Sequence, residues 1–342
     1  MEELASRNKI KFDKYRLKKL VIALLPLVAL IALFVAYLII LNANDYNVSM
    51  NLKTLLNQSI VLILVATGAI FIFTLGQFDI SLGANTLFAA VIGTLAYKAS
   101  GNIFVLFLVC IVVAVACSLL NAVIASIFHL PMFVTTIAML SVLTALATFL
   151  IQSEGTASGT SFSITLPSNL VNDLSAIDTP AFKISVVVIF MVLMIFIFNF
   201  TKVGRKMKFL GGNQNCAKLT GISVSLFGII AFALAGLGAG LGSSMTVVYA
   251  HTVSTTTASS IGMSVFIAIV FGGMPINGGA RSRIYSALIG GISYNLMTNI
   301  LFILFQSMQG VRDGLVQVIS GIFFLAIVFV ASINYRSKNL PR

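Results

Sequence analysis

The chain has 342 residues, of which 59% are apolar and only 9% are charged, whereas an ordinary soluble domain is about 45–50% apolar and about 25% charged. A soluble protein of this length needs far more polar surface. The composition therefore excludes a water-soluble globular fold, a disordered chain, collagen and a small disulfide scaffold, and it predicts an all-α polytopic membrane protein.

Ten apolar segments are candidates for membrane-spanning helices, because such a helix needs about 20 apolar residues. The first segment follows a basic stretch, but its 22 apolar residues exceed the core of a signal peptide, so we expect a retained helix. The eighth segment is short, and a broken or re-entrant helix is the alternative there. The segments are Leu20–Leu41, Leu55–Leu75, Ile80–Tyr97, Ile103–Leu130, Met132–Ile151, Ile184–Phe200, Val224–Tyr249, Ile261–Met274, Ile284–Gln306 and Leu315–Asn334.

The positions of lysine and arginine predict the orientation, because cytoplasmic loops carry an excess of positive charge. With the N-terminus inside, the inner side carries 17 of the 21 basic residues, in 1–19, 201–223, 275–283 and 335–342. The outer side carries Lys53, Lys98, Lys183 and Arg312. We therefore predict about ten helices with both termini cytoplasmic. The formal charge of +12 is explained by this topology, and nucleic-acid binding is not expected.

The topology divides the chain into a basic cytoplasmic N-terminus (1–19), a transmembrane domain (20–334) and a cytoplasmic tail (335–342). Two loops are long enough to contact partners, the polar external loop 152–183 and the basic cytoplasmic loop 201–223. No Walker-type Gly-x4-Gly-Lys-Ser/Thr sequence occurs, so we expect no nucleotide site on this chain. The three cysteines lack the spacing of a metal site or a disulfide framework, and we predict reduced thiols and no metal.

Asn213 and Gly221 bracket a short segment of the cytoplasmic loop. Asparagine is a favoured N-cap and glycine permits the left-handed conformation that ends helices, so the segment predicts a helix of about two turns. Such a helix has a shape that docks into a partner. On physical grounds alone, a solvated basic turn is an equal alternative.

Glycines repeat at a spacing of four within Ala235–Gly242. Small residues at that spacing let helix backbones approach closely. We predict close packing within the subunit, with an interface between two subunits as the alternative.

The loop 201–223 resembles the coupling-helix region of permeases from bacterial ATP-binding-cassette (ABC) importers for simple sugars of the ribose, galactose and xylose type. The family pattern is Gly-Arg-x5-Gly-Gly-Asn-x2-Ala-Ala-x2-Ser-Gly-Ile, and this chain departs from it with Cys216 and Thr220, both small. The matching residues are Gly204, Arg205, Gly211, Gly212, Asn213, Ala217, Gly221 and Ile222.

Three further stretches resemble motifs of the same family. Residues 76–83 resemble its Gly-x2-Asp-Leu-Ser-Val-Gly motif, and residues 121–135 resemble its Asn-Gly…Leu-Pro-x-Phe-Ile-Val-Thr segment. Residues 271–281 resemble its Gly-Gly-x4-Gly-Gly-Arg-Gly turn, with Ala280 inserted before Arg281. The four matches follow the family order.

The resemblance implies a permease subunit that imports a simple sugar, a monosaccharide, by alternating access in the bacterial cytoplasmic membrane. It implies three partners besides lipid: an ABC ATPase, which would bind the ATP and Mg²⁺, a second permease subunit (identical or paralogous), and an extracellular solute-binding protein. No cofactor and no catalytic residue are expected on this chain. Coupling to the ATPase is expected of Gly204, Arg205, Gly211, Gly212, Asn213, Ala217, Lys218 and Gly221.

Asp79 lies at the edge of the third predicted segment, where a carboxylate is costly and marks a functional site by default. We favour a cap of a helix beginning at Ile80, which contributes about 1 kcal/mol, over a position on the solute path. Uncharged polar residues in the spans are further path candidates, and interhelical hydrogen bonding is the simpler alternative for each. The candidates are Asp79, Asn121, Thr135, Thr136, Asn295, Asn299 and Gln306.

Other solutes and another transporter class remain as alternatives. The same superfamily contains permeases for autoinducer-2, nucleosides and branched-chain amino acids. A secondary transporter driven by an ion gradient usually carries ionisable groups at mid-membrane depth. The predicted spans hold none apart from the edge positions Asp79 and Lys98, which disfavours that class.

Overall fold

The structure, a computed structural model, describes residues 24–158, 161–257, 261–275, 278–308 and 310–339. Most of these residues lie in helices. The elements are a helix Leu24–Ala43, α2 Val48–Thr74, α3 Leu82–Ser100, α4 Ile103–Ile127, α5 Met132–Glu154, β1 Thr156–Ser158, β2 Ser161–Thr165, α6 Ser168–Ile177, α7 Pro180–Phe200, α8 Lys202–Gly212, α9 Gln214–Leu219, α10 Val224–Ala250, β3 Thr252–Ser254, α11 Ile261–Phe271, the 3-10 turn η1 Gly279–Arg281, α12 Tyr285–Leu304 and α13 Arg312–Asn339.

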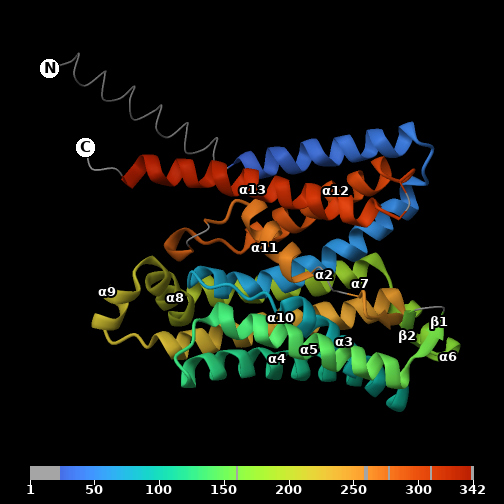
Figure 1. The fold of residues 1–342 in the computed structure, drawn as a ribbon, viewed down its shortest axis with the longest axis horizontal. Helices are drawn as coiled ribbons and strands as arrows, with labels where there is room; N and C mark the ends of the chain where they lie inside the picture. The colour runs from blue at the N-terminus through green and yellow to red at the C-terminus, as the bar shows by residue number, and fades with distance from the viewer. Residues whose placement is uncertain (1–23, 159–160, 258–260, 276–277, 309, 340–342) are drawn as a thin grey trace.

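Each of the ten predicted apolar segments overlaps a helix, so the prediction of an all-α polytopic membrane protein is confirmed. Within the described residues, seven helices are long and apolar enough to cross a membrane: Leu24–Ala43, α2, α4, α5, α7, α10 and α12. The apolar stretches of α11 and α13 are shorter. The number of spans and the side on which the termini lie stay predictions. In Figure 1 the start of the helix Leu24–Ala43 and the end of α13 face the end of the bundle that carries α8 and α9.

α2 and α10 form the centre of the bundle, with α3, α4 and α5 on one side and α11, α12 and α13 on the other (Figure 1). Glycine permits the close contacts of α10. A Cβ on Gly240 would lie 2.5 Å from the Cα of Ile111 in α4, and one on Gly238 would lie 2.5 Å from the carbonyl oxygen of Leu64 in α2. Packing within the subunit, the favoured interpretation of this glycine repeat, is confirmed.

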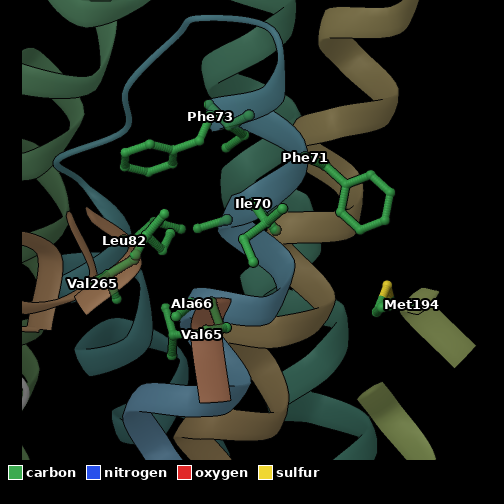
Figure 2. Close-up of a cluster of buried hydrophobic side chains, with 14 of the residues drawn as sticks. Val65, Ala66, Ile70, Phe71, Phe73, Leu82, Met194 and Val265 are labelled. Atoms are coloured by element: carbon green, nitrogen blue, oxygen red, sulfur yellow. The ribbon is translucent and has the colours of Figure 1, made fainter. Parts of the chain in front are cut away.

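The core is built around α2, whose residues from Ser59 to Thr74 are all buried. Figure 2 shows that Phe71 points toward Met194 of α7 while Phe73 lies on the side of Leu82. The Phe71 ring meets that of Phe198 edge-on at 5.3 Å between centroids. A helix that is apolar on every face fits this central position.

The end of the bundle opposite α8 and α9 holds a small sheet that the sequence did not predict. Its order is β1-β2-β3, all antiparallel, with Ser163 facing Ser254 across the β2–β3 pair. The expected external loop 152–183 therefore contains β1, β2 and α6, and β3 joins it from the far side of α10. The strands are too short for a clear alternating pattern.

Lys183 lies at the same end of the bundle, where it was expected at a helix edge, but it is almost completely buried in the first turn of α7. Its ammonium group pairs with Asp178 and donates a hydrogen bond to Asn57 of α2. Lys53, whose side chain is 58% exposed, approaches Asp178 from solvent at 3.4 Å. The buried pair ties α2 to the segment between α6 and α7.

Replacing Lys183 by methionine is expected to destabilise the protein by about 3 kcal/mol, because it leaves a largely buried carboxylate without its closest counter-charge. The readout is the thermal unfolding midpoint of the purified protein in detergent. Lys53→Met is the matched control, and its effect should be small because the Lys53 side chain is 58% exposed and Asp178 keeps its pair with Lys183. If the two variants lowered the thermal midpoint equally, the buried Lys183 would contribute no more to stability than the exposed Lys53, and the prediction would be wrong.

Candidate coupling site and buried polar clusters

The segment between α7 and α10 folds into α8 and α9. The Asn213 side chain accepts hydrogen bonds from the amides of Asn215 and Cys216, at 3.0 and 3.1 Å. Gly221 has φ +77°, and the amide of Ile222 donates to the carbonyl of Ala217 at 3.1 Å. The predicted N-cap and the predicted glycine terminator are both confirmed, and they enclose the six residues of α9.

α9 projects from the bundle at one end (Figure 1). Ala217 is its one buried residue, and the side chain of Leu219 is 88% exposed. Cys216 and Lys218 are also exposed. An apolar side chain this exposed, beside a basic one on a short capped helix, is available for contact with another protein.

α8 directly precedes α9 and holds it against the bundle. The helix α8 was not predicted from the sequence, although Val203, Met207 and Leu210 recur at the spacing of one helix face. Met207 and Leu210 are buried. The Lys208 ammonium group lies 4.1 Å from the centroid of the Phe198 ring and donates to the side chain of Asn199 at 2.7 Å. Partial burial lowers the pKa of Lys208.

The predicted coupling residues divide into two groups in the structure. Gly204 and Gly211 face the bundle, because a Cβ on either would overlap a carbonyl oxygen, of Phe198 and of Thr74 respectively. The remaining predicted residues, apart from the buried Ala217, are solvent-exposed, and a Cβ on Gly212 or Gly221 would meet open space. These exposed residues are Arg205, Gly212, Asn213, Lys218 and Gly221.

Asp79 lies in the connection between α2 and α3 and is 5% exposed. Its Oδ1 accepts hydrogen bonds from the amide and the hydroxyl of Ser81, at 2.8 and 2.6 Å. The predicted cap of a helix beginning at Ile80 is wrong in its position, because α3 begins at Leu82 and its N-cap residue is Ser81. Burial raises the pKa of the Asp79 carboxyl to about 6, and the hydrogen bonds from Ser81 act in the opposite direction.

Ser81 joins Asp79 to α4, since its hydroxyl also accepts from the Asn121 side chain at 2.8 Å. One turn further along α3, Asn85 donates to the hydroxyl of Ser118, also in α4, at 2.9 Å. Three acceptor oxygens of this cluster have no hydrogen-bond partner among the described residues: Asp79 Oδ2, Asn85 Oδ1 and Asn121 Oδ1. Unpaired acceptors of this kind suit hydroxyl or water donors.

The other path candidates lie elsewhere. Asn299 donates to Gln58 of α2 at 2.8 Å, and Asn295 to Ser59 at 3.4 Å, so both join α12 to α2. Thr135 and Thr136 bond locally, to the carbonyls of Met132 and Phe133. Gln306 lines a surface hollow with Asn44. Of the seven candidates, Asp79 and Asn121 meet through Ser81, a residue that was not predicted although it stands two residues after the carboxylate. Asn295 and Asn299 form a second pair within α12, where the Asn299 side chain donates to the Asn295 carbonyl at 2.8 Å.

The chain matches a family model described as branched-chain amino acid transport system / permease component, over residues 51–332. The matched region contains α8, α9, the Asp79 cluster and η1. The chain belongs to this family of permeases. The predicted localisation, a multi-pass protein of the bacterial cytoplasmic membrane, is confirmed by that membership together with the apolar helices.

Individual relatives are similar over most of their length. The chain is 24% identical over 318 residues to the ribose import permease protein RbsC of Escherichia coli (strain K12), covering 92% of each chain. It is 27% identical over 285 residues to RbsC of Bacillus subtilis (strain 168), covering 82% of this chain and 84% of the relative. It is 25% identical over 283 residues to the autoinducer 2 import system permease protein LsrC of Yersinia enterocolitica, covering 81% and 75%. No solved structure matches this chain.

Proposed function

We propose that this permease is the membrane subunit of an ATP-driven importer and that α9 is the element that docks into the ATPase. The observation that carries the proposal is the geometry of α9, which is capped at both ends and presents Leu219 at 88% exposure. ATP and Mg²⁺ would be bound by the ATPase. The second permease subunit would be either an identical chain or a paralogue, and an extracellular protein would deliver the solute.

The proposed solute is a monosaccharide, transported inward by alternating access. Two of the relatives reported above carry ribose import in their names, and the third carries autoinducer 2 import. The unpaired acceptors of Asp79, Asn85 and Asn121 are chemically suited to hydroxyl groups. Autoinducer-2, nucleosides and branched-chain amino acids are the competing solutes.

The test is to purify the tagged chain from its native membrane in mild detergent and to identify the proteins that accompany it. We expect an ABC ATPase, and a solute-binding protein that can then be screened against ribose, other monosaccharides and autoinducer-2. If no ATPase accompanies the chain under conditions that preserve a known importer complex, the proposal fails. A transporter driven by an ion gradient would then replace it.

Cys216 gives a direct test of the proposed orientation. It is exposed on α9, whereas Cys110 and Cys117 are buried. We therefore expect a membrane-impermeant maleimide to label the native chain only from the cytoplasmic side, and the bound ATPase to protect it. Cys216→Ser should abolish labelling, and Asp173→Cys in that background, on the exposed face of α6, should restore it from outside. Labelling of Cys216 in intact cells would contradict the orientation.

A further inference from the structure

The end of α8 packs directly against the end of α2. A Cβ on Gly211 would overlap the carbonyl oxygen of Thr74, the last residue of α2, and would lie 3.0 Å from the amide nitrogen of Gly279. No side chain separates the two helices at this point. The contact is therefore made by backbone atoms, which cannot yield by changing rotamer.

The turn that contains Gly278 and Gly279 closes the other side of the same contact. Gly278 has φ +63°, and a Cβ there would lie 2.6 Å from the Thr74 carbonyl oxygen. Gly279 has φ +80°, and a Cβ there would lie 3.2 Å from the Gly211 carbonyl oxygen. The positive φ favours glycine at both positions, and at Gly278 the lack of space requires it as well. Three segments distant in the sequence thus meet at the Thr74 carbonyl.

The chain leads from this contact to the buried carboxylate within five residues. The amides of Gly76 and Gln77 turn back to the carbonyls of Phe73 and Ile72, at 3.0 and 3.3 Å. Asp79 then bonds to Ser81, and Ser81 to Asn121 of α4. Hydrogen bonds therefore connect the end of α2 to α3 and α4, so that a displacement of this end can move both helices.

We propose that Gly211, together with Gly278 and Gly279, is the positioning contact through which a movement of α8 and α9 reaches the α2–α3 connection. The proposal rests on the proposed coupling of α9 to an ATPase. α8 also packs on α7 at Gly204, but α7 is its own preceding helix, whereas the contact with Thr74 brings in the centre of the bundle. The absence of a side chain at Gly211 is needed for this contact and hence for coupling, whereas α8 could form with a larger residue at that position.

The test uses the complete importer in proteoliposomes, with ribose as the transported probe and with ATP hydrolysis measured in parallel. Gly211→Ala is expected to retain the ATPase and its hydrolysis but to lower ribose uptake per ATP about fivefold or more, a typical size for coupling between sites. Gly211→Val should lower it further. Because alanine favours a helix over glycine, loss of α8 would not explain this result. Gly228→Ala in α10 is the control, since its Cβ would meet only the flexible end of Met132.

Uptake per ATP that stays unchanged in Gly211→Val would overturn the inference. Absence of the ATPase from the unmodified complex would instead overturn the proposed function. Hydrogen exchange of the unmodified complex provides a measurement that does not depend on how the variants fold or on the solute. A non-hydrolysable ATP analogue should change exchange in 205–212, 72–79 and 278–283 together, and a change confined to 205–219 would contradict the contact.

Discussion

Replacing Leu219 by aspartate is expected to weaken binding of the ATPase by about 10- to 100-fold. Burying a leucine contributes about 1.5–3 kcal/mol, and about 1.4 kcal/mol corresponds to a tenfold change in affinity. The side chain is 88% exposed in the free chain, so nearly all of its surface is available for burial by a partner. An aspartate at this position would lose that gain and would also require desolvation of a carboxylate.

The measurement is the amount of ATPase retained on the immobilised permease as the ATPase concentration is varied. Met50→Asp is the matched control, because Met50 is also a highly exposed apolar residue (71%) but lies in the first turn of α2, at the other end of the bundle (Figure 1). Equal binding by the wild-type chain and the Leu219 variant would exclude α9 as the docking element. Equal loss in both variants would point to a general defect of the membrane protein.

The second large effect is expected for Asp79→Ala. The substitution removes the acceptor of both hydrogen bonds from Ser81, and leaving a buried donor unpaired typically costs about 1–3 kcal/mol. The link from the α2–α3 connection to Asn121 of α4 should loosen as well. We expect a lower thermal midpoint in detergent and a loss of uptake that is larger than the loss of ATP hydrolysis.

Asp79→Asn separates the hydrogen bonds from the charge. The amide oxygen can take the place of Oδ1 and accept from Ser81, so most of the stability should remain. The amide nitrogen of the asparagine takes the place of the unpaired Oδ2. Because this nitrogen donates and does not accept, a solute hydroxyl that donates to Oδ2 would lose its acceptor. A stable variant with normal ribose uptake would assign Asp79 to structure alone. Destabilisation equal to that of Asp79→Ala would show that the charge matters more than the two hydrogen bonds.

The sequence alone determined the features that depend on composition or on neighbouring residues. The scarcity of charge required a membrane protein, and each apolar segment produced a helix. The caps of α9 were predictable because Asn213 bonds to amides two and three residues away and Gly221 acts through its own φ angle. Interactions between residues two or three positions apart can be predicted from the local sequence, because all the partners lie within it.

Tertiary structure decided which distant residues meet. The burial of Lys183 against Asn57 and the pairing of β2 with β3 depend on elements far away in the chain. The polar candidates of the spans likewise separated into different clusters. Gly211 was selected as part of the loop motif, but its contact with Thr74 could not be predicted, because the approach of two backbones leaves no pattern in either segment and is set by how the whole bundle packs.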